Sequence, residues 1–199
     1  MGTNPVTKEM NDITDSDQPF LPPIEDPQDP TMKQAYEMAR SYMGKVPTPL
    51  KVFSARMPPS FNQFAMKIAE LDRELTIPPE TAMLVRAQVA RINVCLFCMD
   101  AQRAAAIAAK MNEAKFDALD QYSTSPLFTE GERSVLDYVT ELTRDKKVNP
   151  VKFSRTARHY SERQICEIVY LVAREHVYNM TNIGLNIHSD MLCKIPQRK

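Results

Sequence analysis

The sequence predicts an all-α fold of about eight helices, and three features of the chain indicate it. Apolar residues recur at intervals of three and four, which places them on one side of a helix. Prolines and capping residues stand where these stretches begin, for example Pro79, Thr129 and Ser161. No stretch has the alternation of apolar and polar residues that is typical of a β-strand.

Residues 1–30 differ in composition from the rest of the chain and predict an extended arm. They contain six prolines and seven acidic residues against a single lysine. Such a segment has little apolar surface to bury, so we expect it to be mobile or to lie over the domain or a neighbouring subunit. Phe20, Leu21 and Ile24 are the apolar side chains available as anchors. The helical domain is predicted to span residues 31–199.

The first half of this domain is predicted to form four helices. Thr31 is a candidate N-cap for the first, which ends at Gly44. Prolines open the next three helices at Pro47, Pro59 and Pro79. The helix from Pro59 carries four apolar residues at helical spacing: Phe61, Phe64, Ile68 and Leu71.

The second half is predicted to be helical as well. A helix over residues 95–110 is followed by a short one capped by Asn112 and by another that begins at Asn149. Thr129 and Ser161 each precede a Glu or Gln by three residues, which is a capping box. The helix from Ser161 is the longest, ends near residue 184 and carries one predicted buried stripe: Ile165, Val169, Val172, His176, Met180 and Ile183.

Composition excludes several classes of function. The chain has 25 basic and 25 acidic residues, and its basic residues are scattered, so a nucleic-acid partner is not expected. Its four glycines form no phosphate loop or dinucleotide fingerprint. No apolar run approaches the roughly 18 residues of a membrane span, and no signal region opens the chain. We therefore expect a cytoplasmic protein that does not bind a membrane.

The segment Cys95-Leu96-Phe97-Cys98 is the feature that points most directly to chemistry. Two cysteines three residues apart share one helix face and can form a reversible disulfide. A helix N-terminus nearby would stabilise a thiolate, the reactive form of sulfur. The alternative is a pair of small buried side chains without chemistry. A metal site is not predicted, because Cys166 and Cys193 are isolated and no histidine lies at ligand spacing.

Residues on both sides of this pair make the chain resemble the carboxymuconolactone decarboxylase superfamily, specifically its alkylhydroperoxidase D-like branch. The matching residues are Pro78, Pro79, Leu84, Val85, Val89, Ala90, Asn93, Cys95, Cys98 and Ala106, then Phe128, Thr129, Glu132, Arg133, Leu136 and Tyr138, and finally Tyr178, Asn179, Leu185, Asn186, Ile187, Ser189, Asp190, Leu192 and Cys193. The resemblance covers roughly residues 35–195. It implies an orthogonal array of helices and assembly into dimers, trimers or hexamers.

The resemblance also implies roles for individual residues. In that branch a glutamate, eleven residues, C-x-x-C, three residues and a histidine form the functional pattern. Cys98 would attack a peroxide, Cys95 would resolve the product into a disulfide, and the glutamate and histidine would relay protons. Here the glutamate position holds Met83 and the histidine position holds Gln102, which can only hydrogen-bond. His176 is a candidate replacement base from another helix, although a core histidine is the alternative.

The resulting prediction is a thiol-dependent peroxidase or disulfide oxidoreductase with an atypical proton relay. Its substrate would be a small hydroperoxide or a disulfide, and an external thiol would supply electrons. No metal or organic cofactor is expected beyond the redox-active disulfide. One alternative is a cofactor-free lactone decarboxylase-type lyase, for which the paired cysteines have no use. The other is a non-catalytic or ligand-binding member of the fold, which the loss of both relay positions favours.

Overall fold

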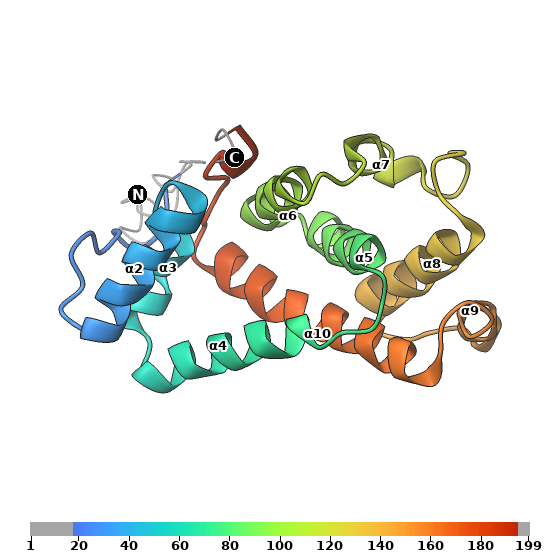
Figure 1. Ribbon diagram of the computed structural model, residues 1–199, viewed down its shortest axis with the longest axis horizontal. Coiled ribbons are helices and arrows are strands. Elements are labelled where there is room, and N and C mark those ends of the chain that lie inside the picture. Colours follow the sequence, from blue (N-terminus) through green and yellow to red (C-terminus); the bar gives the residue numbers. More distant parts are fainter. Residues whose placement is uncertain (1–17, 195–199) are drawn as a thin grey trace, which may run out of the picture.

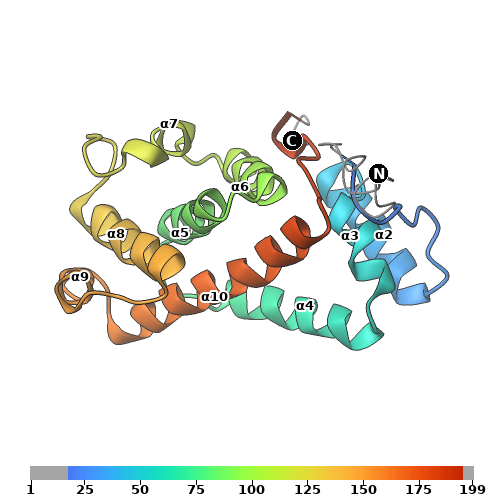
Figure 2. The ribbon, with the colours of Figure 1, turned by 180° about the vertical axis from the view of Figure 1, so that it is seen from behind.

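The computed structural model of the chain describes residues 18–194, and these residues form helices and connecting segments without any strand. Nine α-helices, α2 to α10, and three short 3-10 helices account for the regular structure of this range. The prediction of an all-α fold with about eight helices is confirmed for these residues. Two views of the ribbon show α2 and α3 at one end and the larger array of α5 to α10 at the other, joined by α4 (Figures 1 and 2).

Three of the helices before the cysteine pair, α2, α4 and α5, begin at prolines, and α3 follows Pro47. Their bounds are α2 Pro30–Met43, α3 Thr48–Val52, η1 Ser54–Arg56, α4 Pro59–Arg73 and α5 Pro79–Ile92. The N-cap of α2 is Asp29 rather than Thr31, because the Asp29 carboxylate accepts the N–H of Met32 at 2.9 Å. The helix ends as predicted at Gly44, whose φ of 75° is the left-handed conformation that glycine adopts without strain.

The second half contains α6 Leu96–Ala108, α7 Glu113–Asp117, η2 Leu119–Gln121, α8 Glu130–Asp145, α9 Pro150–Thr156, α10 Glu162–Gly184 and η3 Leu192–Lys194. Both predicted capping boxes are present, at Thr129 for α8 and at Ser161 for α10. Asn112 and Asn149 cap α7 and α9 through their side chains, as expected. The predicted helix starts are therefore confirmed throughout this half.

Helix α5 lies in the middle of the array, between α6, α8 and α10 (Figure 1). Its valines pack with apolar residues of α8 and α10 in the largest core cluster, which includes Val85, Val89, Val135, Val139, Ile168 and Leu171, all with no exposed surface. A helix buried on every side is apolar around most of its circumference, and nine of the 14 residues of α5 are buried. The cysteine pair follows this central helix directly.

The described part of the arm, residues 18–29, lies over the domain. The Phe20 N–H donates to Leu185 O at 3.0 Å, and the Ile24 N–H donates to Lys51 O at 3.1 Å. The hydroxyl of buried Tyr36 donates to Ile24 O at 2.8 Å. Phe20 itself remains 61% exposed, so these attachments are made mainly by the backbone. Residues 1–17 of the predicted arm lie outside the described residues.

Two predicted apolar stripes differ from the burial that is observed. Ile68 is the only buried residue of α4, whereas Phe64 and Leu71 are exposed. On α10 the prediction of the buried stripe is wrong, because three of its members are exposed: Val169, Met180 and Ile183. The face of α10 that packs inward carries Ile168, Leu171, Val172, Glu175, Asn179 and Asn182. The inward face of α10 is therefore apolar at Ile168, Leu171 and Val172 and polar at Glu175, Asn179 and Asn182.

Candidate active site

The turn between α5 and α6 positions the cysteine pair. The Cys95 N–H donates to Ala90 O at 2.9 Å and the Val94 N–H donates to Arg91 O at 3.1 Å, which closes α5 with a Schellman motif. Val94 occupies the left-handed position of this motif, with φ 56°, although glycine is the usual residue there. The turn makes Cys95 the N-cap of α6, and Cys98 falls in its first turn.

Cys95 and Cys98 are joined as a disulfide, with their Cα atoms 5.3 Å apart. The Cys98 N–H donates to Cys95 Sγ at 3.4 Å. Both residues are buried, with 1% and 3% of their surface exposed, in a cluster with Ala90, Phe97 and Tyr178. The sulfur atoms thus lie at the positive end of a helix dipole and away from bulk water, where electrostatic effects on a thiolate are strong.

Asn182 of α10 contacts both sulfur atoms. Its Nδ2 lies 3.3 Å from Cys98 Sγ and 3.9 Å from Cys95 Sγ. Its Oδ1 is buried and has no hydrogen-bond partner while the cysteines are joined. A thiol on either cysteine is a donor that the disulfide lacks, so the reduced pair can supply the missing hydrogen bond. Sequence reasoning did not single out this residue.

Glu175 lies two helical turns before Asn182 on the same face of α10 and is 1% exposed. Its Oε1 accepts Asn179 Nδ2 at 3.0 Å, and its Oε2 accepts Gln102 Nε2 at 3.4 Å. Asn179 in turn accepts Asn93 Nδ2 at 2.9 Å. Burial raises the pKa of Glu175, and this effect outweighs the opposing effect of nearby arginines and amides.

Two arginines and an aspartate lie beside this buried carboxylate. Arg174 Nη2 is 3.1 Å from Asp72 Oδ2, and Arg174 Nη1 is 4.0 Å from Glu175 Oε2. Arg86 Nη1 of α5 is 4.0 Å from the same Asp72 oxygen, and burial lowers the pKa of Arg86. Burial and Asp72 also raise the pKa of Tyr170 to about 12. Helices α4, α5 and α10 thus surround Glu175 with charged and polar groups.

The residues predicted for the site are partly brought together. Cys95, Cys98 and Gln102 share α6, and Gln102 reaches the buried carboxylate of α10. Met83 is buried on α5 and accepts a long contact of 3.6 Å from Arg86. His176 does not join them, because its Nε2 lies 3.0 Å from Lys146 Nζ and its Nδ1 lies 2.9 Å from Val172 O. Its neighbour Glu175, one position earlier, is the titratable residue that faces α6.

Membrane and metal sites can be assessed over residues 18–194. Within this range no helix is both long enough and apolar enough to cross a bilayer. The same residues contain no group of three or more His, Cys, Asp or Glu side chains placed to hold a metal ion. The cysteine pair and its polar surroundings are therefore the candidate site that the described residues offer.

No protein-family model matches the chain. The uncharacterized protein YnjA of Escherichia coli (strain K12) is 27% identical over 166 residues, which cover 80% of this chain and 88% of that protein. Similar folds occur among solved structures. The debrominase Bmp8 in complex with 2,3,4-tribromopyrrole aligns with a TM-score of 0.74 and 19% identity over 86% of this chain and 92% of that one.

A second solved structure is the alkylhydroperoxidase AhpD core of an uncharacterized peroxidase-related protein from Ralstonia eutropha. It aligns with a TM-score of 0.72 and 19% identity, covering 88% of this chain and 97% of that one. Both alignments cover most of the chain. The chain therefore has the helical fold of these alkylhydroperoxidase AhpD-like structures.

Proposed function

We propose that the protein is a thiol-dependent peroxidase that reduces a small hydroperoxide with the Cys95–Cys98 pair. The observation that carries this proposal is the joined cysteine pair at the start of α6, with Asn182 Nδ2 3.3 Å from Cys98 Sγ. The helix N-terminus and the amide donor both favour a thiolate at Cys98. A thiolate is the form of cysteine that attacks a peroxide.

The proposed reaction uses both cysteines and needs no cofactor. The Cys98 thiolate attacks the outer oxygen of the hydroperoxide, the O–O bond breaks, and the alcohol leaves after taking up a proton. The Cys95 thiol then displaces the oxygen from the sulfenic acid on Cys98, which forms the disulfide and releases water. Two electrons pass from the dithiol to the peroxide. An external thiol restores the dithiol by disulfide exchange.

Burial of the pair favours a small substrate over the disulfide of another folded protein. Cys98 is 3% exposed, and a protein disulfide would need space beside its sulfur for a second chain. A hydroperoxide needs only a narrow opening past neighbouring side chains such as Phe97 and Tyr178. Cys166 and Cys193 are free thiols. Free thiols are typical of proteins that function in a reducing compartment such as the cytoplasm.

The similarity to the debrominase Bmp8 supports a second candidate, reductive dehalogenation of a small aromatic compound. The same two electrons would break a carbon–bromine bond. The carbon takes up a proton, bromide leaves, and the cysteine pair becomes the disulfide. This reaction differs from peroxide reduction in its substrate and not in the fate of Cys95 and Cys98.

A thiol titration tests the proposed function. We expect reduced wild-type protein to lose two thiols rapidly on addition of a small organic hydroperoxide, without crosslinks between chains. The Cys98→Ser variant should not lose its remaining Cys95 thiol at that rate. The matched control is Cys166→Ser, which removes an exposed free cysteine outside the site and should behave like the wild type.

Two other results would contradict the peroxidase proposal. Bromide release from a bromopyrrole, with no reaction toward hydroperoxides, would favour dehalogenation. A wild-type pair that reacts with neither compound would favour a protein without catalysis. In both cases the peroxidase proposal would be abandoned.

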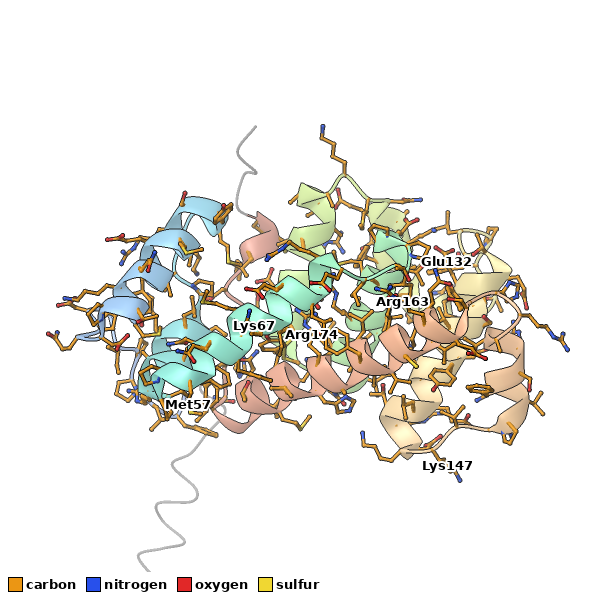
Figure 3. All side chains as sticks on the ribbon, turned by 60° about the horizontal axis from the view of Figure 1, so that its bottom comes forward. Met57, Lys67, Glu132, Lys147, Arg163 and Arg174 are labelled. Carbon is orange, nitrogen blue, oxygen red and sulfur yellow. A yellow bond between two sulfur atoms is a disulfide. The ribbon has the colours of Figure 1, made fainter. Side chains whose placement is uncertain are left out.

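We also infer that the protein assembles with copies of itself through the outer face of α4 and α10. Figure 3 shows Lys67 of α4 and Arg174 of α10 on this side of the molecule. A groove of about 390 Å³ runs between the two helices, lined largely by apolar side chains such as Phe64, Leu71 and Val177. Apolar stripes on two adjacent helices are typical of an interface between subunits.

A further inference from the structure

Glu175 is a buried carboxylate that the cysteine chemistry described so far does not use. A carboxylate that is 1% exposed is expensive to ionise, so such a group is retained where its proton or its charge has a purpose. Its hydrogen-bond donors are the side-chain amides of Asn179 and Gln102, at 3.0 and 3.4 Å. These donors hold the carboxylate without neutralising it.

The charged groups around Glu175 come from each helix that packs near it. Helix α4 contributes Asp72, α5 contributes Arg86 and α10 contributes Arg174. Both arginines contact Asp72. Three of their buried nitrogen atoms have no hydrogen-bond partner: Arg86 Nε, Arg174 Nε and Arg174 Nη1. On the side of α8, Lys146 contacts His176 instead. The cluster is therefore balanced when Glu175 is ionised and carries one positive charge when it is protonated.

The cysteine pair lies next to this cluster on the opposite helix. Gln102, which donates to Glu175, follows Cys98 by four residues on α6, so the two side chains are neighbours on one helix face. Asn182, which touches both sulfur atoms, lies on the same face of α10 as Glu175. The carboxylate and the sulfur atoms thus share one buried polar layer between α6 and α10.

We propose that Glu175 is the proton-storing partner of the Cys95–Cys98 pair, in place of a carboxylate at position 83, with Gln102 as the positioning residue that ties the carboxylate to the helix of Cys98. The inference rests on the proposed redox function. Glu175 takes up the proton that Cys98 loses on forming the thiolate, and this proton is released to the alkoxide when the O–O bond breaks. Glu175 likewise takes up the proton of the Cys95 thiol and releases it to the oxygen that leaves as water. Glu175 ends as it began, so protons and electrons balance.

The test is the pH dependence of thiol alkylation in the reduced full-length chain, with Cys166 and Cys193 replaced by serine. We expect two coupled titration steps for the Cys95–Cys98 pair. In Glu175→Gln one step should disappear, and the apparent pKa of the remaining thiol should fall by about one unit, because a neighbouring negative charge is gone. Glutamine keeps the shape and the polar character of the side chain.

The matched control is Glu167→Gln, which changes a buried glutamate of the same helix that hydrogen-bonds to Thr76 and Ile77 instead. This control should keep both titration steps. An unchanged profile in Glu175→Gln, or the same change in Glu167→Gln, would overturn the inference. Alkylation reports thiol protonation and not peroxide turnover, so failure of the proposed function would be visible separately in the peroxide titration.

A second measurement needs no substitution and covers the case in which Glu175→Gln does not fold. Infrared difference spectra between the oxidised and reduced wild-type protein should contain the C=O band of a protonated buried carboxyl group that changes with the redox state. A difference spectrum without any carboxyl band would contradict a proton-storing role for Glu175.

Discussion

Asn182 donates its amide N–H to the sulfur of Cys98 at 3.3 Å, and this contact makes a prediction at the scale of one residue. Leucine at position 182 keeps the volume but removes the donor. A hydrogen bond to a charged group contributes about 1.5–3 kcal/mol, so the apparent pKa of the reactive thiol should rise by about one to two units in Asn182→Leu. Reaction with hydroperoxide at pH 7 should become roughly tenfold slower.

The measurement is the pH profile of thiol alkylation, followed by the rate of peroxide-driven thiol loss. Asn93→Leu is the control, because Asn93 donates to Asn179 and not to a sulfur. A profile for Asn182→Leu that coincides with the wild type would show that the amide does not stabilise the thiolate.

The sequence predicted the cysteine pair but not the residues that surround it. Cys95 and Cys98 are neighbours on one helix, so local spacing was enough. Asn182 and Glu175 reach α6 from positions 84 and 73 residues away, which depends on how the helices pack. A signal was present, because Glu175, Asn179 and Asn182 recur at helical spacing on a long helix. His176 was considered instead, as a base that could approach the cysteine pair from another helix.

Glu167 makes a prediction at the scale of an element, because it ties α10 to the loop that enters α5. Its carboxylate accepts the N–H groups of Thr76 and Ile77 at 2.9 and 2.8 Å. Arg163 adds a 3.0 Å contact to the same carboxylate and donates to Glu74 O at 3.0 Å (Figure 3). Burial alone would raise the pKa of Glu167, but these hydrogen bonds outweigh it, and the pKa lies below its ordinary value.

A carboxyl group whose pKa is lower in the folded state stabilises the fold above its unfolded pKa, and this stabilisation is lost as the pH falls. Glu167→Gln should therefore reduce the free energy of unfolding at pH 7 by about 1–3 kcal/mol. As the pH falls below about 4 the difference from the wild type should shrink, because the wild-type carboxylate becomes protonated as the pH passes through its lowered pKa. Urea unfolding at the two pH values measures both effects. A constant difference at all pH values would assign the effect to packing.

Helix starts were more predictable than buried faces. Prolines, asparagines and capping boxes act within one turn, and the helices from Pro79, Asn112, Thr129, Asn149 and Ser161 began where expected. Burial depends on what packs against a helix. Val169, Met180 and Ile183 of the predicted stripe on α10 stay exposed in the single chain, and Asn182 of the inward face contacts the cysteine pair. Apolar periodicity alone does not distinguish a core from an interface.

At the scale of the whole molecule, α4 is the helix that the single chain leaves least covered. One of its 15 residues is buried, although Phe64 and Leu71 are large and apolar and are 46% and 44% exposed. Val177, Met180 and Ile183 continue the exposed apolar surface on α10. The inward face of α10 meanwhile holds Glu175 and Asn182. A second copy packed on the outer face would therefore support the helix that completes the active site.

This arrangement predicts that Phe64→Glu weakens assembly without unfolding the chain. Phe64 is half exposed in the single chain, so a carboxylate at this position should change the stability of the fold little. In the assembly the same carboxylate would be buried without a cation or hydrogen-bond donor beside it, which is unfavourable. We expect the dissociation constant to rise by roughly thirtyfold or more, a loss of about 2 kcal/mol. Light scattering during size-exclusion chromatography measures this shift.

Val151→Glu is the control. Val151 is 76% exposed on α9, so this substitution should leave the mass of the assembly unchanged. A monomeric wild type would contradict assembly, and a Phe64→Glu variant that assembles as well as the control would place the subunit contacts elsewhere.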